Sequence, residues 1–550
     1  MDYNNIPKEK FAPANNHDVK HDKKLDTKPV GYFKDALIRF CKNKGSVVAF
    51  VIISLLILFA IIVPFLTPYT VAYEDTYFSY CYPRNELCVQ WGWDFWDGCA
   101  EKTYNEQTYL EYLAIGTETG NSVVKDNEYE VSTKKVGGYF IKDSSGSYVY
   151  SGSYYTFRFN SYHKSGCVKV SLTAEQYAAL QQYQDEHQIQ IIYPAINRDE
   201  KILKAYPQHN QNYNAWFEWE EVYTANAKGE RSTKKTVIPK VLRNEDGSFA
   251  LDENGNIQFV SNYTLANGKD GYTSVMLIEG DVKQYNYSVP MAGGLYEVRV
   301  NYYEYYKYVH DVPGDKISEP RFLFGTTHTG KDILTCLASG ARLSFLLAIA
   351  VSSVNMIVGA IYGAIEGYYG GKLDLFMERF SDILSAVPFM IVISLLKMHM
   401  GKTPQLLILF IAFFLTGWIG MAGRVRMQFY RFKNQEYVLA ARTLGAKDRR
   451  IMFKHIFPNS LGTIITGSIL SIPGMIFSES SLSYLGIINL STGNMTSVGN
   501  LLASAQNYLT TFPHMMLFPA LFICLLMLCF NLFGNGLRDA FNPSLRGAED

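Results

Sequence analysis

The chain has 550 residues, of which 48% are hydrophobic, and its 51 Lys and Arg balance its 51 Asp and Glu to a formal net charge of zero. This composition excludes a collagen-like chain and a mainly disordered one. The charges are unevenly placed, because residues 74–320 hold 23 basic and 34 acidic residues whereas the remainder holds 28 and 17. The split excludes a uniform soluble protein.

The first apolar segment is residues 46–66, which include no charged residue. A helix rises 1.5 Å per residue, so this segment covers a hydrocarbon core of about 30 Å. The apolar run is longer than that of a cleavable signal peptide, and no small-residue cleavage site follows it. We therefore predict a retained transmembrane helix at 46–66, preceded by a cytoplasmic N-terminal segment, 1–45.

Residues 74–320 are numerous enough to bury a core of their own, and their pattern predicts an α+β domain. Aromatic and polar residues alternate around Gly and Ser turns in 138–159, as in β-hairpins. Thr173 and Gln176 have the spacing of a capping box, which predicts a helix reaching about His187. Asp-Gly and Asn-Gly pairs predict turns within 243–278, and 296–309 predicts another strand.

Four cysteines lie in this domain: Cys81, Cys88, Cys99 and Cys167. Disulfides persist outside the cell, so we predict that these four are disulfide-bonded, with three pairings left open. Their spacings match no zinc pattern, and no metal site is predicted.

Five more apolar segments predict transmembrane helices, at 343–366, 383–396, 404–423, 461–477 and 515–533. Gly359, Gly363 and Gly367 share one face of the first of these helices. Small residues on one face favour close helix packing, either within this chain or against a partner. Prolines in three of the segments predict kinks: Pro388, Pro473 and Pro519.

The orientation follows from Lys and Arg in the short loops. Residues 422–460 hold nine of them, whereas 479–514 hold none. With six helices across the membrane, both termini and 422–460 are predicted to be cytoplasmic. Residues 74–320 and 479–514 are then extracellular.

The cytoplasmic loop predicts two short helices beside the membrane. Asn434 can cap the first helix, and Glu436 lies in its first turn, where a negative charge is favourable. Gly445 is suited to stop this helix. A second helix, 447–457, is expected to end at Pro458.

The loop pattern resembles the EAA loop of ABC-importer permeases. In that family this loop forms the coupling helix that seats in a groove of the ATPase subunit. The resemblance marks seven ATPase-coupling residues: Glu436, Ala440, Ala441, Gly445, Ile451, His455 and Pro458. Phe457 stands where the family usually has Leu.

Further segments resemble OppC/DppC-type peptide permeases. Residues 324–334 are similar to the family's L-G-T-D-x-x-G-R-D-x-L, with Thr327 in place of Asp and Lys331 in place of Arg. Matching segments are also found at 340–344, 378–382, 479–486 and 530–539, the last with Asn535 in place of Asp. The resemblance covers nearly all of the chain outside 74–320. It implies an all-α polytopic membrane protein with six transmembrane helices, a type I ABC importer permease, which here carries a large extracellular α+β insert domain. Residues 321–550 would be its permease core.

Residues 325–331 also have the G-x4-G-K spacing of a phosphate-binding loop. Asp332 follows where Ser or Thr would hold Mg²⁺, so we do not expect nucleotide to bind there. No catalytic residue is predicted in this chain.

The resemblance implies a permease subunit of an ABC importer for oligopeptides or dipeptides in the plasma membrane, and not an enzyme. Its expected partners are a homologous OppB/DppB-type permease, two ABC ATPase subunits, an extracellular peptide-binding lipoprotein and the lipid bilayer. No nucleic-acid partner is expected. No cofactor is expected on this chain, since ATP-Mg is bound by the ATPases. Two alternatives stay open: a permease for nickel or another small solute, and a membrane-anchored surface receptor that uses the extracellular domain. That domain could hold peptide, dock the lipoprotein or be a folded appendage.

Overall fold

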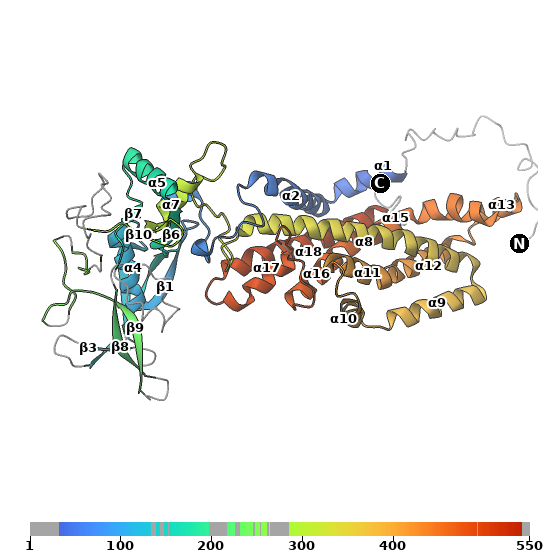
Figure 1. Ribbon diagram of the computed structural model, residues 1–550. Coiled ribbons are helices and arrows are strands. Elements are labelled where there is room, and N and C mark those ends of the chain that lie inside the picture. Colours follow the sequence, from blue (N-terminus) through green and yellow to red (C-terminus); the bar gives the residue numbers. More distant parts are fainter. Residues whose placement is uncertain are drawn as a thin grey trace, which may run out of the picture.

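The computed structural model describes residues 32–133, 139–142, 148–151, 153–196, 217–225, 231–245, 248–253, 255–260, 263, 285–491 and 493–541. They form a bundle of apolar helices and an α+β domain, which lies beyond one end of the bundle (Figure 1). The chain enters this domain after the first long helix of the bundle and leaves it before the second. The bundle contains helices α1 (Tyr32–Lys42), α2 (Lys44–Leu66), α8 (Ile333–Tyr369), α9 (Gly371–Ser385), α10 (Phe389–His399), α11 (Gln405–Gly417), α12 (Ile419–Phe432), α13 (Glu436–Thr443), α14 (Asp448–Arg450), α15 (Phe457–Ile469), α16 (Ser471–Tyr484), α17 (Val498–Ala505) and α18 (His514–Phe541).

Five stretches of helix in the described ranges are long and apolar enough to cross a membrane: Lys44–Leu66, Ile333–Tyr369, Gln405–Phe432, Asp448–Tyr484 and His514–Phe541. A sixth crossing is possible only if α9 and α10, which are bent by 72°, count as one. The predicted helix at 383–396 is therefore wrong as a continuous helix. The bend lies at Pro388, which precedes the first residue of α10. Proline disfavours helical backbone in the residue before it, so α9 cannot continue through Pro388 and ends before it.

The glycine face of α8 packs against α12 of the same chain. A Cβ atom added to Gly359 would lie 2.6 Å from the Trp418 carbonyl oxygen, and one on Gly367 would lie 2.7 Å from that of Arg426. Gly363 lies closer still to the backbone of α12. Close backbone contact of this kind is possible only without side chains, so the face fixes the two helices together.

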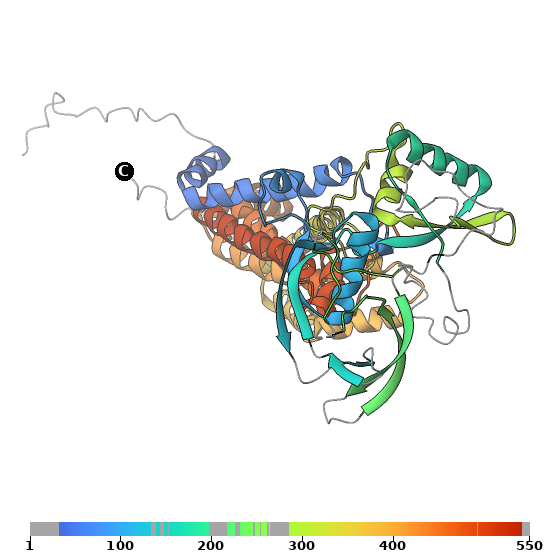
Figure 2. The ribbon, with the colours of Figure 1, turned by 90° about the vertical axis from the view of Figure 1, so that its left-hand side faces the viewer.

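In the α+β domain, the described strands form three antiparallel sheets. The first has the order β1-β5-β2, the second β10-β11-β6 with β7 beside β11, and the third β4-β3-β8-β9. Figure 2 views the molecule from the side of this domain. The strands are β1 (Cys99–Asn105), β2 (Val124–Thr133), β3 (Tyr139–Lys142), β4 (Tyr148–Ser151), β5 (Ser153–Asn160), β6 (Cys167–Thr173), β7 (Ile192–Tyr193), β8 (Phe217–Ala225), β9 (Arg231–Pro239), β10 (Ser288–Pro290) and β11 (Leu295–Asn301). The helices are α3 (Glu86–Gln90), α4 (Glu106–Thr119), α5 (Ala174–His187) and α7 (Tyr302–His310).

Local sequence signals in this domain are confirmed. The capping box forms at the start of α5, where Thr173 Oγ1 accepts from the Gln176 N–H (3.2 Å) and Gln176 Oε1 accepts from the Thr173 N–H (3.0 Å). β3 and β4 form the expected hairpin pair. Gly255 adopts the positive φ of a turn (81°). The predicted turn at 246–247 and residues 264–278 lie outside the described residues.

The strand predicted at 296–309 is wrong in its second half. β11 ends at Asn301, whose side chain accepts from the Tyr303 N–H (3.2 Å) and caps α7. Asparagine favours this position because its short side chain satisfies an unpaired N–H at the start of a helix. The closely spaced tyrosines beyond it therefore lie on a helix rather than alternating across a sheet.

The predicted disulfides are absent. All eight cysteines lie in described ranges, and each is a free thiol. Cys81 and Cys167 occupy different environments, because Cys81 donates to the Ser161 carbonyl (3.5 Å) while Cys167 begins β6 opposite Asn301. Burial raises the pKa of the Cys81 thiol to about 11.

Residues 325–331 join the domain to α8. Thr326 Oγ1 donates to the Phe78 carbonyl (2.6 Å) and accepts from the Cys81 N–H (2.8 Å). Lys331 pairs with Glu74 (3.1 Å). Asp332 caps α8, accepting from the Thr335 N–H (2.9 Å). These groups bond to other parts of the same chain. Residues 325–331 are therefore a structural connection between the domain and α8, which we call the neck.

Candidate functional site

The seven residues marked by the sequence lie on one hairpin at the end of the bundle opposite the α+β domain (Figure 1). The hairpin consists of α13 and the helix that begins with α14. α1 packs against the last turns of α18, with the rings of Phe40 and Phe533 5.5 Å apart.

The turn of the hairpin depends on Gly445. Its φ of 79° lies in the left-handed region, and its N–H donates to the Arg442 carbonyl (3.0 Å). Nothing lies within 4 Å of a Cβ added there, so the backbone conformation and not the available space favours glycine. The predicted cap is wrong, because Gln435, not Asn434, precedes α13, and its side chain makes no capping hydrogen bond.

The second helix does not end at Pro458 as predicted. It widens into a π-helical turn at Ile451–Ile456 and continues as α15 into the membrane-crossing stretch. The Phe457 N–H donates to the Met452 carbonyl, five residues back. Pro458 follows this wide turn and stands in the first turn of α15. Proline lacks a backbone N–H, and the first turn of a helix tolerates that loss.

The inner face of the hairpin is locked to the bundle. Val438, Ile451 and Ile456 are fully buried in a cluster that includes residues of α8, α12 and α15. Tyr368, in the last turn of α8, donates from its hydroxyl to Asp448 Oδ1 (2.6 Å). A displacement of the hairpin would therefore displace α8 and α12 as well.

The outer face carries exposed apolar side chains. Leu444, at the tip, is 89% exposed, and Tyr437, Leu439 and Phe453 are also exposed. Beside them is an open groove of about 630 Å³, lined by Lys447, Arg449, Arg450, Phe453, Lys454 and Pro458. Apolar side chains beside a basic groove suit a partner protein whose surface is apolar and acidic.

The marked residues divide between these two faces. Glu436, Ala440, Gly445 and Pro458 are exposed, whereas Ile451 is buried and supports the hairpin. Ala441 and His455 are half-buried. Sequence analysis missed the contact between Tyr368 and Asp448, because the two residues are 80 positions apart and no local spacing connects them.

A charged cluster lies where α8, α9 and α12 meet. Arg426 donates to Asp374 (2.6 and 2.9 Å) and to Glu378 (2.9 and 3.1 Å), and its Nε lies 3.5 Å from Glu366. Glu366 is 3% exposed, so its carboxylate lies inside the bundle and not at a membrane surface. The cluster instead ties α9 to the two helices joined by the glycine face.

A cavity of about 400 Å³ opens at the end of the bundle near the α+β domain. Hydroxyl and amide side chains are frequent in its lining, which includes Thr327, Thr329, Asn489, Ser491, Asn500 and Ser504. Nearby, the buried Glu479 carboxylate accepts from the hydroxyls of Ser344 (2.7 Å) and Ser483 (3.2 Å). Glu479 lies in the segment 479–486, whose resemblance to the permease family did not predict these hydrogen bonds. In the part of the chain that the structure describes, no group of three or more His, Cys, Asp or Glu residues could hold a metal ion.

Two family models match separate parts of this chain. Residues 355–547 match the family described as binding-protein-dependent transport system inner membrane component. Residues 31–82 match the N-terminal TM domain of oligopeptide transport permease C. The oligopeptide transport system permease protein OppC of Bacillus subtilis (strain 168) is 43% identical over 232 residues, which are 42% of this chain and 75% of that protein.

A second permease and one solved structure are also similar to parts of this chain. The dipeptide transport system permease protein DppC of the same organism is 40% identical over 227 residues, which are 40% of this chain and 69% of that protein. A solved chain of the MetNI methionine ABC transporter in an inward-facing conformation is 14% identical, with 38% of this chain and 96% of that chain covered. Its TM-score of 0.31 is too low to support a statement about the fold.

Proposed function

The chain belongs to the family of OppC- and DppC-type permeases, and from this premise we propose that it is the permease subunit of an ABC importer for oligopeptides or dipeptides. The relatives carry oligopeptide and dipeptide transport in their names, and they do not favour nickel or a surface receptor. As a permease of this family, the chain is a multi-pass membrane protein.

The observation that carries the coupling role is the hairpin 436–458, which is exposed on one face and locked to α8 and α12 on the other. We propose that Leu444 and the basic groove seat against an ATPase subunit. Two ATPases would bind ATP-Mg, and this chain would hydrolyse nothing itself. Closure of the ATPases would then move the hairpins and tip the bundle between outward-open and inward-open states.

We propose that the hairpin end of the bundle, with both termini, faces the cytoplasm, and that 74–320 forms an extracellular insert domain. The nine Lys and Arg in 422–460 support this orientation. The position of the insert at the opposite end of the bundle supports it too (Figure 1). Long loops cross a membrane largely regardless of charge, so the acidic character of the insert is no obstacle.

We propose that the path runs between this chain and a homologous permease, and that an extracellular lipoprotein delivers peptide to the outer face. The cavity of about 400 Å³ near the insert is a candidate entrance, because its hydroxyl and amide groups can hydrogen-bond a peptide backbone without selecting its sequence. Because this cavity lies beside the neck, a binding protein that delivers peptide to it would also lie next to the insert.

Uptake and association together test this function. A strain lacking the chain should lose uptake of labelled oligopeptides or dipeptides while its nickel uptake stays unchanged, and the reverse would favour the nickel alternative. In the restored strain, Gly445→Trp should abolish co-purification of the ATPases, because a bulky ring at the hairpin turn occupies the docking face. Gly293→Trp is the matched control, since Gly293 has a positive φ (86°) and open space in the insert. Normal ATPase co-purification with Gly445→Trp would contradict the coupling role.

A further inference from the structure

A short aromatic segment of the insert domain, residues 86–98, consists of helix α3 and the turns that follow it, and we call it the loop 86–98. Five apolar side chains at alternate positions are exposed: Leu87 by 53%, Val89 by 37%, Trp91 by 61%, Trp93 by 52% and Phe95 by 60%. Contiguous exposed apolar patches mark contact with another protein or with a membrane. The hairpin and the cavity described above make no use of this loop.

The loop stands on a fixed base. The Asn85 N–H donates to the Trp96 carbonyl (2.8 Å), and the Gly98 N–H donates to the Pro83 carbonyl (3.0 Å), which close the loop. Trp96 itself has a positive φ of 58°. Such a conformation is costly for a bulky residue, so the surrounding contacts must hold it in place.

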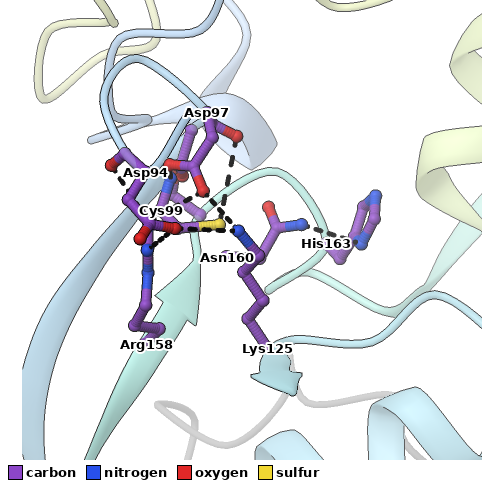
Figure 3. Close-up of polar contacts among 9 residues, drawn as sticks. Asp94, Asp97, Cys99, Lys125, Arg158, Asn160 and His163 are labelled. Atoms are coloured by element: carbon purple, nitrogen blue, oxygen red, sulfur yellow. Dashed lines mark hydrogen bonds and ion pairs between the residues drawn. The ribbon is translucent and has the colours of Figure 1, made fainter. Parts of the chain in front are cut away.

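Ion pairs from the neighbouring strands fasten the acidic residues of the loop (Figure 3). Asp97 accepts from Lys125 of β2 (2.9 Å) and Arg158 of β5 (2.8 Å). Asp94 pairs with the same two cations. Burial opposes ionisation of Asp97, but the hydrogen bonds from Lys125 and from the Cys99 N–H still lower the pKa of this carboxyl. The remaining acid of the loop, Glu86, has an arginine 3.5 Å away. Asp97 is therefore buried at the base, whereas the Asp94 side chain is 77% exposed with its charge balanced by Lys125 and Arg158. The other exposed side chains of the loop are mainly apolar.

The loop touches the outer end of a membrane-crossing helix. The Trp96 ring centroid lies 6.5 Å from those of both Phe324 and Phe518, and these two rings stack at 4.2 Å. Phe518 lies in the second turn of α18, about 6 Å along its axis. The adjacent Leu517 and Leu521 are 54% and 57% exposed. Trp96 therefore joins the loop to the end of this helix, which also has exposed apolar side chains.

We propose that the loop 86–98 is a lipid anchor, and that Trp91, Trp93 and Phe95 enter the headgroup region of the bilayer leaflet around the outer end of α18. Tryptophan favours this region because its large ring is apolar while its N–H stays hydrated. The anchor holds the insert at a fixed tilt to the membrane. The inference requires that α18 crosses a membrane and does not depend on which solute is transported.

Photolabelling of the full-length chain tests the anchor directly. The chain is reconstituted in vesicles of phosphatidylcholine and phosphatidylglycerol that contain a phosphatidylcholine with a diazirine near the glycerol end of one acyl chain. Trypsin cleavage after Arg84 and Lys102 then releases the whole loop as peptide 85–102. We expect this peptide to carry at least tenfold more label than peptide 170–198 of the same domain, with the label at 91–95.

Peptide 45–84, which contains most of α2, reports membrane insertion independently. Label in 45–84 with only background label in 85–102 would overturn the anchor and leave the transport function standing. Absence of label from both peptides would overturn the anchor together with the membrane assignment.

A triple variant supplies the second arm. Trp91→Ser/Trp93→Ser/Phe95→Ser should lower the labelling of 85–102 at least fivefold. The control Val289→Ser/Met291→Ser alters two side chains of the same domain that are each 44% exposed, and it should leave that labelling unchanged. If the loop binds a protein partner instead, the native loop should be unlabelled and the triple variant should weaken binding of the delivering lipoprotein about tenfold, which would overturn the lipid assignment.

Discussion

Replacing Leu444 with Ala separates the docking role of the hairpin from its folding. Leu444 is 89% exposed, so little of its side chain is buried in the fold, and truncation should change stability by less than about 0.5 kcal/mol. If the side chain is buried in an ATPase groove, its loss removes about 1.5–3 kcal/mol of binding free energy. Since 1.4 kcal/mol corresponds to a tenfold change, we expect ATPase affinity to fall about 10- to 100-fold.

The assay is the binding of purified ATPase to the permease in nanodiscs, with thermal unfolding measured on the same samples. Leu251→Ala is the matched control, because Leu251 is 56% exposed but lies in the insert. Val438→Ala should instead change the thermal unfolding, because Val438 is fully buried and its truncation should destabilise the hairpin by about 2 kcal/mol. Unchanged ATPase affinity in Leu444→Ala would refute the proposed docking face.

Three further predictions concern packing, thiols and pH. Gly363→Ala should lower the thermal unfolding temperature in detergent, because its Cβ would overlap the α12 backbone. Gly423→Ala is the control and should not lower it, since nothing lies within 4 Å of a Cβ added there. Equal effects of the two substitutions would contradict the close contact between α8 and α12. Cys81 and Cys167 should resist an impermeant maleimide in the native chain, because burial raises the pKa of both thiols. Both should react after unfolding without any reductant. A need for reductant would show that they form disulfides. Burial lowers the pKa of His163 to about 4, so the unfolded chain binds more protons between about pH 6.5 and 4, and the insert should lose stability as the pH falls through this window. His163→Gln should reduce this pH dependence, measured by chemical unfolding, and an unchanged slope would exclude His163 as its source.

Features set by neighbouring residues could be predicted from the sequence. The capping box at Thr173 and the left-handed turn at Gly445 each depend on a few adjacent positions, and both are found. The apolar segments were also recognisable, because a membrane selects length and hydropathy without regard to partners.

Features set by distant contacts could not be predicted. Proline at 458 is a helix stop by local rules, but packing of Ile451 and Ile456 keeps the chain helical and a π turn absorbs the mismatch. Glu366 and Arg426 are 60 residues apart in the sequence, and only the fold brings their side chains together. The predicted disulfides failed for the same reason, since the number of cysteines says nothing about which of them meet.

The same distant contacts explain how the two ends of the molecule could act together. α8 is 37 residues long, about 55 Å, and runs unbroken from the neck of the insert to the hairpin. At one end Asp332 caps it within the neck, and at the other Tyr368 bonds Asp448 of the hairpin. Between them, the glycine face holds α8 against α12, which leaves little room for the two helices to slide. Because the helix is held at both ends, we expect a movement of the hairpin to reach the neck of the insert.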